Sequence, residues 1–229
     1  KIFFRNFNIY SHLYRTIDLV IFSNTRRGVS MEGHEQKALD FKAMRTKLTR
    51  FMMTYKFALD EMNTKIDILK QEFQLIHDYN PIEHVKSRVK SPESIIRKVK
   101  NKGIEHSLPA IQENIHDIAG VRITCSFISD IYTISEMLQQ QKDITVVECK
   151  DFIKNPKPNG YKSLHLILQI PVFMSDGEHQ VYVELQIRTI AMDFWASLEH
   201  KIYYKYDREV PNELLDELKN ARSLKISGR

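Results

Sequence analysis

The spacing of hydrophobic residues predicts helices in the first half of the chain. Apolar residues recur at steps of three and four from position 41 to 76, which defines one stripe along a long helix. A short connection is expected next, before Ser91, which is a good N-cap. Pro92 suits the first position of a helix and Gly103 is placed to stop it, so a second helix is predicted at 92–102.

Apolar runs predict strands in the rest of the chain. Four strands are expected, at 119–127, 144–149, 163–170 and 180–188. The last two are joined by Ser-Asp-Gly-Glu and should form an antiparallel hairpin. Asp130 is expected to cap one of four further helices, at 109–114, 130–140, 190–206 and 212–224. This order predicts an α/β (α+β) fold, a mixed β-sheet flanked by helices, with a long N-terminal helix and C-terminal helices.

The length of the chain favours one domain. With 229 residues, of which 42% are apolar, it can bury one good core. Residues 1–30 are rich in Phe, Tyr and Ile but follow neither a helical nor an alternating period. We therefore expect an irregular extension over 1–35 and a single domain over 36–229. One hypothesis is that Met31 is the biological start and that the preceding stretch is not native.

The composition indicates which kinds of binding partner the protein could have. Lys and Arg number 34 against 29 Asp and Glu, giving a formal charge of +5, which favours polyanions such as nucleotides or RNA. Two cysteines, both in apolar runs, indicate buried reduced thiols in a cytoplasmic protein and neither a disulfide framework nor a zinc cluster. No apolar run approaches the roughly 20 residues that a membrane span requires, so no membrane partner is expected.

Familiar catalytic motifs are missing from the sequence. It contains only seven glycines and no GxGxxG, and its nearest match to a P-loop has His-Glu where Lys and Ser or Thr are needed. Neither HExxH nor GxSxG occurs. Two His-Asp pairs, at 77–78 and 116–117, lack the further ligands of a metal-dependent phosphohydrolase.

A basic segment at the start of the second helix is a candidate phosphate site. Arg88 and Lys90 precede the helix, and Ser94 and Lys98 lie one turn apart on one of its faces. Together with the free amides of the first turn, these groups could grip a triphosphate without glycines. A capped surface helix with solvated cations would give the same pattern.

Two acidic residues are candidate magnesium ligands. Asp117 precedes the first predicted strand, which contains Arg122, and Glu184 shares one face of the last strand with Gln186 and Arg188. An Asp at the mouth of one strand that faces Glu184 on a later strand would supply two hard oxygen ligands, which suit Mg²⁺ better than zinc. The alternation in the last strand could also mark an ordinary half-solvated strand.

A proline-rich loop supplies cations around an aromatic residue. Tyr161 is accompanied by Lys150, Lys154, Lys157, Asn159, Lys162 and His165. A base could stack on the ring while the cations neutralise phosphates. The same pattern suits single-stranded RNA, so the leading alternative is an RNA-binding regulatory protein. Another is a different nucleotidyltransferase, which would release pyrophosphate.

Five segments resemble, in order, the signature blocks of the RelA/SpoT-type (p)ppGpp synthetase domain. They are SRVKSPESI at 87–95, HDIAGVR at 116–122, KPNGYKSLH at 157–165, VELQIRT at 183–189 and WASLEH at 195–200. The resemblance covers about 45–225, and the short chain looks like the small, synthetase-only members. It implies a nucleotidyltransferase-like fold, Mg²⁺ dependence, ATP as donor, GDP or GTP as acceptor, AMP as by-product and a homo-oligomer, often a tetramer.

The resemblance also implies residue roles. Arg88 and Arg122 would sandwich adenine, while the ATP phosphates would be held by Lys90, Ser94 and Lys98. Asp117 and Glu184 would carry Mg²⁺, and Glu184 would also take the proton from the acceptor 3′-hydroxyl.

On the acceptor side, the resemblance implies that Tyr161 stacks on guanine and that Gln186 supports the ribose. Lys157 and His165 would lie near the acceptor phosphates, and the remaining implied contacts come from Lys150, Asn159 and Lys162, with Arg188 and Glu199 in support. Many relatives carry arginine where Lys150 and Lys162 stand, and lysine lacks the bidentate fork of a guanidinium.

Overall fold

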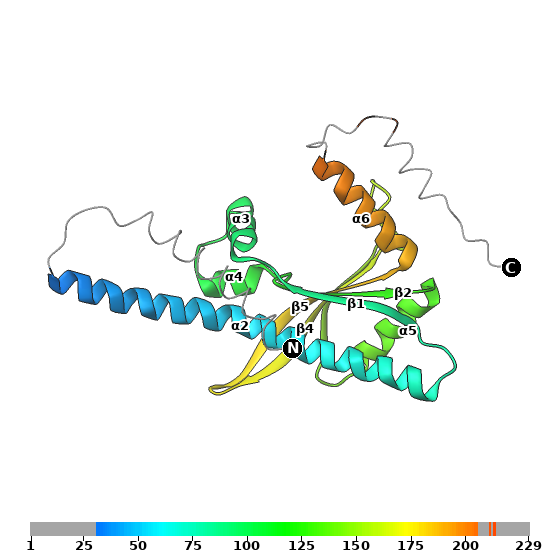
Figure 1. The fold of residues 1–229 in the computed structure, drawn as a ribbon, viewed down its shortest axis with the longest axis horizontal. Coiled ribbons are helices and arrows are strands. Elements are labelled where there is room, and N and C mark those ends of the chain that lie inside the picture. The colour runs from blue at the N-terminus through cyan, green and yellow to red at the C-terminus, as the bar shows by residue number, and fades with distance from the viewer. Residues whose placement is uncertain (1–30, 206–210, 212, 214–229) are drawn as a thin grey trace.

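The computed structural model describes residues 31–205, 211 and 213. The predicted irregular extension therefore lies outside the described residues up to position 30, and so does nearly all of the helix predicted at 212–224. Residues 31–35 are helical, so the expectation of irregular structure is wrong there. Figure 1 shows the arrangement of the described elements.

The long predicted helix is confirmed as α2 (Met31–Ile76) and begins ten residues before the predicted stripe. Apart from Ala58, its buried side chains follow the stripe and are at most 4% exposed; they are Tyr55, Leu59, Met62 and Ile66. They pack on the sheet, and α2 contacts β1, β2, β4 and β5. The helix runs along one face of the sheet and extends beyond its edge (Figure 1).

The sheet has five strands in the order β1-β2-β5-β4-β3. Their bounds are β1 (Ile82–Val89), β2 (Ala119–Cys125), β3 (Thr145–Asp151), β4 (Leu164–Met174) and β5 (Gly177–Thr189). The central pair β2 and β5 is parallel, while the other neighbours are antiparallel, which confirms a mixed sheet. The hairpin of β4 and β5 is confirmed and is longer than predicted.

Strand β1 is absent from the sequence prediction, which assigned a short connection to this segment. Only Ile82 of this strand is fully buried, and the strand lies at an edge of the sheet. Edge strands carry charged side chains and lack the apolar alternation of a covered strand, so IEHVKSRV resembles a loop. As a consequence Arg88 lies on a strand of the sheet and not in a connection.

The shorter helices are α3 (Pro92–Lys102), α4 (Leu108–Asn114), α5 (Ile128–Gln139) and α6 (Ile190–Lys205). The predicted ends of α3 are confirmed, because the Ser91 side chain accepts a hydrogen bond from the Ser94 amide and Gly103 adopts φ 64°. The prediction that Asp130 is the cap of α5 is wrong by one turn. Phe127 is the N-cap residue, and Asp130 inside the helix accepts a hydrogen bond from its amide at 2.9 Å.

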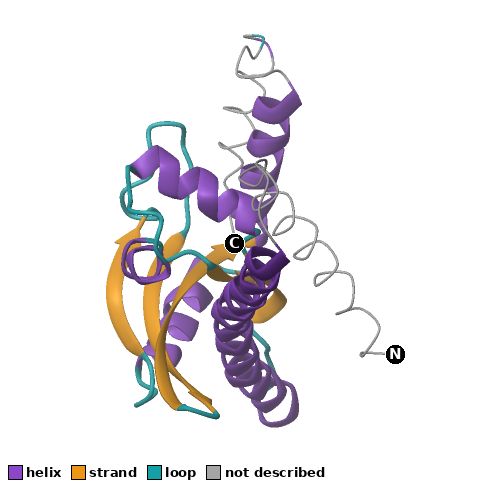
Figure 2. Cartoon of the chain, turned by 90° about the vertical axis from the view of Figure 1, so that its left-hand side faces the viewer, coloured by secondary structure: helices purple, strands orange, loops and turns teal. Residues whose placement is uncertain are grey.

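The sheet has one apolar and one polar face. Inward residues of β2 and β5 are at most 2% exposed, as in Val121, Val183 and Leu185, and α5 joins α2 in contacting these strands. Figure 2 shows the curved sheet with α2 along it. Among the described helices, none combines the length and apolarity that crossing a bilayer would need. Cys125 is buried as predicted, whereas Cys149 on β3 is exposed, contrary to the prediction.

Candidate active site

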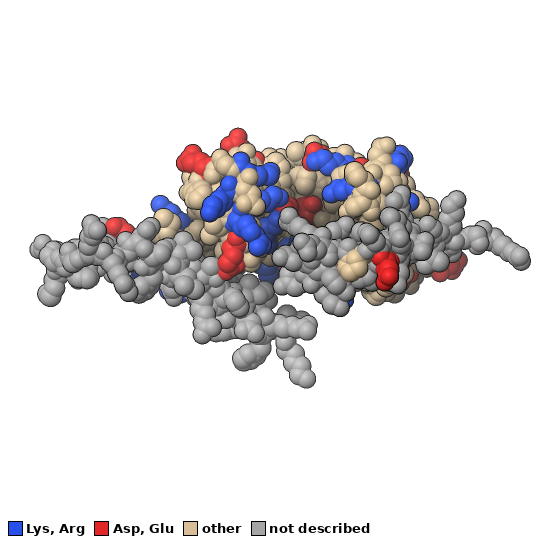
Figure 3. All heavy atoms as spheres, turned by 90° about the horizontal axis from the view of Figure 1, so that it is seen from above, with Lys and Arg blue, Asp and Glu red and all other residues tan. Residues whose placement is uncertain are grey.

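A row of polar side chains crosses all five strands on the polar face. Residues that are direct register partners project from the same face of a sheet. The successive partners across this sheet are Lys86, Arg122, Gln186, His165 and Lys150. Figure 3 shows two groups of Lys and Arg side chains on the molecule's surface, with acidic side chains in the hollow between them.

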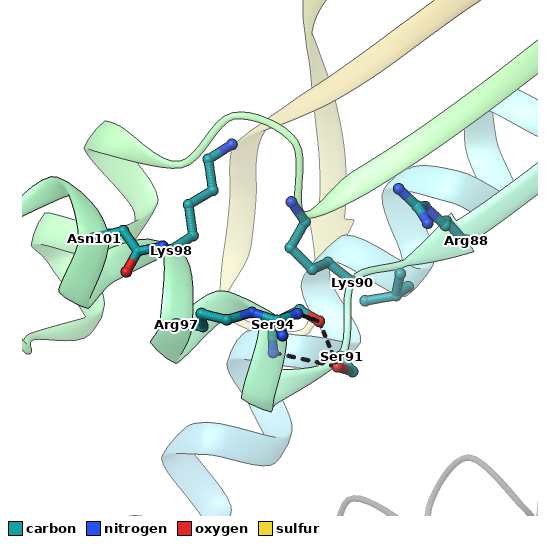
Figure 4. Close-up of a pocket in the computed structure, with 8 residues that line it drawn as sticks. Arg88, Lys90, Ser91, Ser94, Arg97, Lys98 and Asn101 are labelled. Atoms are coloured by element: carbon teal, nitrogen blue, oxygen red, sulfur yellow. Dashed lines mark hydrogen bonds between the residues drawn. The ribbon is translucent and has the colours of Figure 1, made fainter. Parts of the chain in front are cut away.

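The first group surrounds an open pocket of about 530 Å³ at the start of α3. The four predicted phosphate-binding residues all line it, together with Val89, Ser91, Arg97 and Asn101. Figure 4 shows the side chains of Lys90 and Lys98 extending to the same side of the pocket. Arg97 and Asn101 were not predicted from the sequence, although their spacing of three and seven residues from Ser94 places them on the same helix face.

Asp117 lies in the turn before β2 and connects to this pocket. Its Oδ2 accepts from Lys90 Nζ at 2.5 Å and from Lys98 Nζ at 2.7 Å. Burial would raise the pKa of Asp117, but the hydrogen bonds and charges of the two lysines outweigh it and lower the pKa. The second carboxylate oxygen, Oδ1, is buried and has no hydrogen-bond partner among the described residues. The lowered pKa means that Asp117 is ionised.

Glu184 lies on the central strand β5, opposite Gly120 of β2. Its Oε2 accepts from Gln186 Nε2 at 3.0 Å, and its Oε1 lies 3.7 Å from His165 Nδ1. Burial and the nearby cations, Arg188 first, lower the pKa of His165 to about 3. The imidazole is therefore neutral at ordinary pH, and its contact with Glu184 is not an ion pair.

Two arginines behind Glu184 share the same acceptors. Asp193 Oδ1 accepts from Arg122 Nη1 at 3.1 Å and from Arg188 Nη1 at 3.2 Å. Gln186 Oε1 accepts from Nη2 of both arginines, at 3.4 and 2.8 Å. Arg188 is only 4% exposed, and burial lowers its pKa. Asp193 was not predicted from the sequence, because nothing in the spacing of α6 reveals that its first turn reaches the polar face.

The loop before β4 brings the second group of cations to an aromatic cluster. Lys157 Nζ lies 4.8 Å from the ring centre of Phe152 and 5.1 Å from that of Tyr161. Gly160 adopts φ 90°, a conformation that glycine adopts freely, at the turn that presents Tyr161. Asn159 Nδ2 donates to Glu199 Oε1 of α6 at 2.6 Å, which ties the loop to that helix.

Two predicted loop cations have different positions. Lys150 is part of β3 and pairs with Glu148 at 2.7 Å, so its assignment to the loop is wrong. It nevertheless reaches the polar row as the register partner of His165. Lys162 follows Tyr161 in the segment that leads into β4 and is half-buried.

The acidic residues are better suited to Mg²⁺, which water and substrate also help to coordinate, than to a metal ion coordinated by protein ligands alone. No group of three or more His, Cys, Asp or Glu residues that could hold a metal occurs in the described part of the chain. Mg²⁺ often binds one or two carboxylates and completes its shell with water and substrate phosphates. The unpartnered Oδ1 of Asp117, beside a basic pocket, suits this mode.

The family of the chain follows from comparison with known proteins. The family model for the region found in RelA / SpoT proteins matches residues 87–209. The GTP pyrophosphokinase YwaC of Bacillus subtilis (strain 168) is 55% identical over 185 residues, 81% of this chain and 88% of that protein.

Solved structures agree with this match. The small alarmone synthetase 2 of Bacillus subtilis is 54% identical, with a TM-score of 0.70 over 77% of this chain and 91% of that one. The small alarmone synthetase 1 of the same organism, bound to its product pppGpp, is 39% identical, with a TM-score of 0.69 over 77% and 89%. The chain therefore belongs to the RelA/SpoT family of (p)ppGpp synthetases, in its small alarmone synthetase group.

Proposed function

We propose that this chain is a GTP pyrophosphokinase that transfers the β,γ-pyrophosphate of ATP to the ribose 3′-hydroxyl of GDP or GTP. The products are AMP and either ppGpp or pppGpp. The two guanosine products are the alarmones of the stringent response. The observation that carries the proposal is the position of Glu184 on the central strand β5. The basic pocket at α3 lies on one side of it and the Tyr161 loop on the other.

The donor nucleotide belongs in the pocket at α3. Lys90, Ser94 and Lys98 line this pocket and would hold the ATP phosphates, aided by the free amides of the first helical turn. Arg88 and Arg122 lie on adjacent strands and would enclose the adenine from both sides. A planar guanidinium stacks well on a flat base, which favours arginine in this role.

The acceptor belongs at the Tyr161 loop. Guanine would stack on the Tyr161 ring, near which Lys157 already lies. We assign the acceptor phosphates to Lys157 and His165, with Lys150, Asn159 and Lys162 around them. Gln186 would support the ribose, while Arg188 and Glu199 would support the site through the contacts described above.

The transfer needs positioning and charge neutralisation more than covalent help. A bond forms between the 3′-oxygen and the β-phosphorus of ATP as the bond from that phosphorus to the bridging oxygen of AMP breaks. Glu184 accepts the hydroxyl proton, and Lys90 and Lys98 neutralise charge on the phosphates. Mg²⁺ bound by Asp117 and Glu184 would supply further neutralisation and polarise phosphoryl oxygens.

The proposal includes a cytoplasmic homo-oligomer. The resemblance to small alarmone synthetases implies a tetramer, which light scattering of the purified chain would measure directly.

Replacing the proposed base tests the function. Wild-type chain with ATP, GDP and Mg²⁺ should release AMP together with an equal amount of a more highly phosphorylated guanosine, separated by nucleotide chromatography. Glu184→Gln should lower the turnover at least about a hundredfold, because a general base contributes that much, while nucleotide binding survives. Chelation of Mg²⁺ should abolish turnover in the wild type.

The control is the same glutamate-to-glutamine substitution at another position on the same strand. Glu178 of β5 lies at the exposed end of the hairpin, so Glu178→Gln should keep wild-type turnover. Near-wild-type turnover by Glu184→Gln would contradict the assigned base. Release of pyrophosphate in place of AMP would instead identify a different nucleotidyltransferase.

A further inference from the structure

Four side chains form a continuous chain of contacts that ends at Glu184. Arg188 Nη2 donates to the Tyr161 hydroxyl oxygen. That oxygen lies 2.7 Å from His165 Nε2, and His165 Nδ1 faces Glu184 Oε1 at 3.7 Å. The side chain of His165 is only 16% exposed, so its two nitrogens have few other partners available.

The direction of these contacts follows from which groups can donate. A guanidinium has only donors, so the Tyr161 oxygen accepts from Arg188. The hydroxyl has one proton of its own, which then points to His165 Nε2, and the nearby positive charge makes that proton a better donor. With Nε2 as the acceptor, the imidazole proton would lie on Nδ1, where it faces Glu184 Oε1.

We propose that the Tyr161 hydroxyl is a positioning group that holds His165 in the Nδ1–H tautomer. The inference rests on the proposed function, in which Glu184 is the base, and adds a role for the hydroxyl that is separate from stacking by the ring. The Nδ1–Oε1 distance of 3.7 Å is too long for a direct hydrogen bond. The Nδ1–H donor thus stays free for a hydroxyl or phosphate oxygen of the acceptor bound beside Glu184.

Steady-state kinetics of Tyr161→Phe separates the hydroxyl from the ring. The substitution keeps the aromatic face for guanine, so KM for GDP should stay within about twofold, whereas kcat should fall about tenfold through the lost orientation of His165. Tyr79→Phe is the matched control, because it also removes a hydroxyl that donates to a neighbour, Asp130, away from the polar row. It should leave kcat unchanged. A higher KM with unchanged kcat for Tyr161→Phe overturns the inference.

A double-mutant cycle tests whether the hydroxyl acts through His165. Asparagine places an amide nitrogen close to the position of Nδ1 and has no tautomers, so His165→Asn keeps a donor there without help from Tyr161. Adding Tyr161→Phe to His165→Asn should change kcat less than about twofold. The same tenfold loss in both backgrounds would show that the hydroxyl acts independently of His165.

Nitrogen NMR reads the tautomer without relying on turnover. Two-bond proton–nitrogen correlation distinguishes Nδ1–H from Nε2–H imidazoles, and His165→Asn identifies the His165 signals among the nine histidines. The wild type should show Nδ1–H and Tyr161→Phe a mixture. A wild-type Nε2–H tautomer, or no change on substitution, overturns the inference whether or not the proposed reaction is correct.

Discussion

Gly120 is a glycine that the fold does not require. Its φ is not positive, unlike those of Gly103, Gly160 and Gly177. An added Cβ would contact only the backbone oxygen of Arg88, at 3.9 Å, which is an ordinary van der Waals distance. Because Gly120 is opposite both Arg88 and Glu184, a side chain there would project onto the polar face. We infer that the missing side chain leaves room for the donor nucleotide.

Gly120→Val should therefore separate folding from function. Valine suits a strand better than glycine by about 0.5–1 kcal/mol, so the melting temperature should stay the same or rise. Binding of a non-hydrolysable ATP analogue, measured by calorimetry, should weaken at least about tenfold, because the branched side chain fills the space beside Arg88. Unchanged ATP binding in a stable variant would show that the space has no ligand role.

Candidate site residues could be predicted where the sequence itself fixes their geometry. Ser94 and Lys98 share a helix face by spacing alone, and Glu184 and Gln186 share a strand face by alternation. Asp193 could not be found this way, because its contacts with Arg122 and Arg188 depend on how α6 packs against β2 and β5. Tertiary contacts of this kind leave no period in the sequence.

At the scale of elements, α3 depends on the conformation of the residue that caps its C-terminal end. Gly103 ends this helix with φ 64°, and its amide donates to carbonyls of the last turn. An added Cβ would meet no atom within 4 Å, so Gly103→Ala introduces backbone strain without a steric clash. The cost should be about 1 kcal/mol.

Thermal unfolding of Gly103→Ala should therefore show a melting temperature lower by about 2–4 °C, and turnover at 25 °C should stay near the wild-type value. This is the reverse of the outcome expected for Gly120→Val. A Gly103→Ala protein as stable as the wild type would mean that the end of α3 adjusts its backbone freely.

The strands show which elements hydrophobic patterns can predict and which they cannot. Strands β2, β4 and β5 are covered on one face and contain the apolar runs that predict them. Strand β1 has only its first residue fully buried, so its sequence lacks that signal. Its place beside β2 is determined by long-range pairing that local sequence does not encode.

For the whole molecule, the sequence correctly predicts the class of fold. Alternating helical and strand patterns are sufficient for a mixed sheet flanked by helices, whereas the strand order β1-β2-β5-β4-β3 depends on pairing between distant segments. One cluster of buried residues runs from Tyr55 on α2 to Ile187 on β5 in the described part of the chain, and the single domain over 36–229 stays a prediction.

Among the described side chains, the buried members of the core begin at Tyr55. We predict that a chain beginning at Met31 folds and retains full turnover. Circular dichroism and the AMP-release assay check this. Loss of folding on removal of the first thirty residues would contradict this prediction.

Because β2 and β5 are parallel neighbours, the residues proposed for the donor and those proposed for the acceptor lie in two consecutive stretches of sequence. With the exception of Glu184, the residues proposed to act on the donor lie between Arg88 on β1 and Arg122 on β2. Most of the acceptor contacts lie between Lys150 and Gln186, in the excursion that returns as β5. On the proposed assignments, residues that distinguish GDP from GTP would lie in this second stretch, and relatives could differ there while keeping the same residues for ATP.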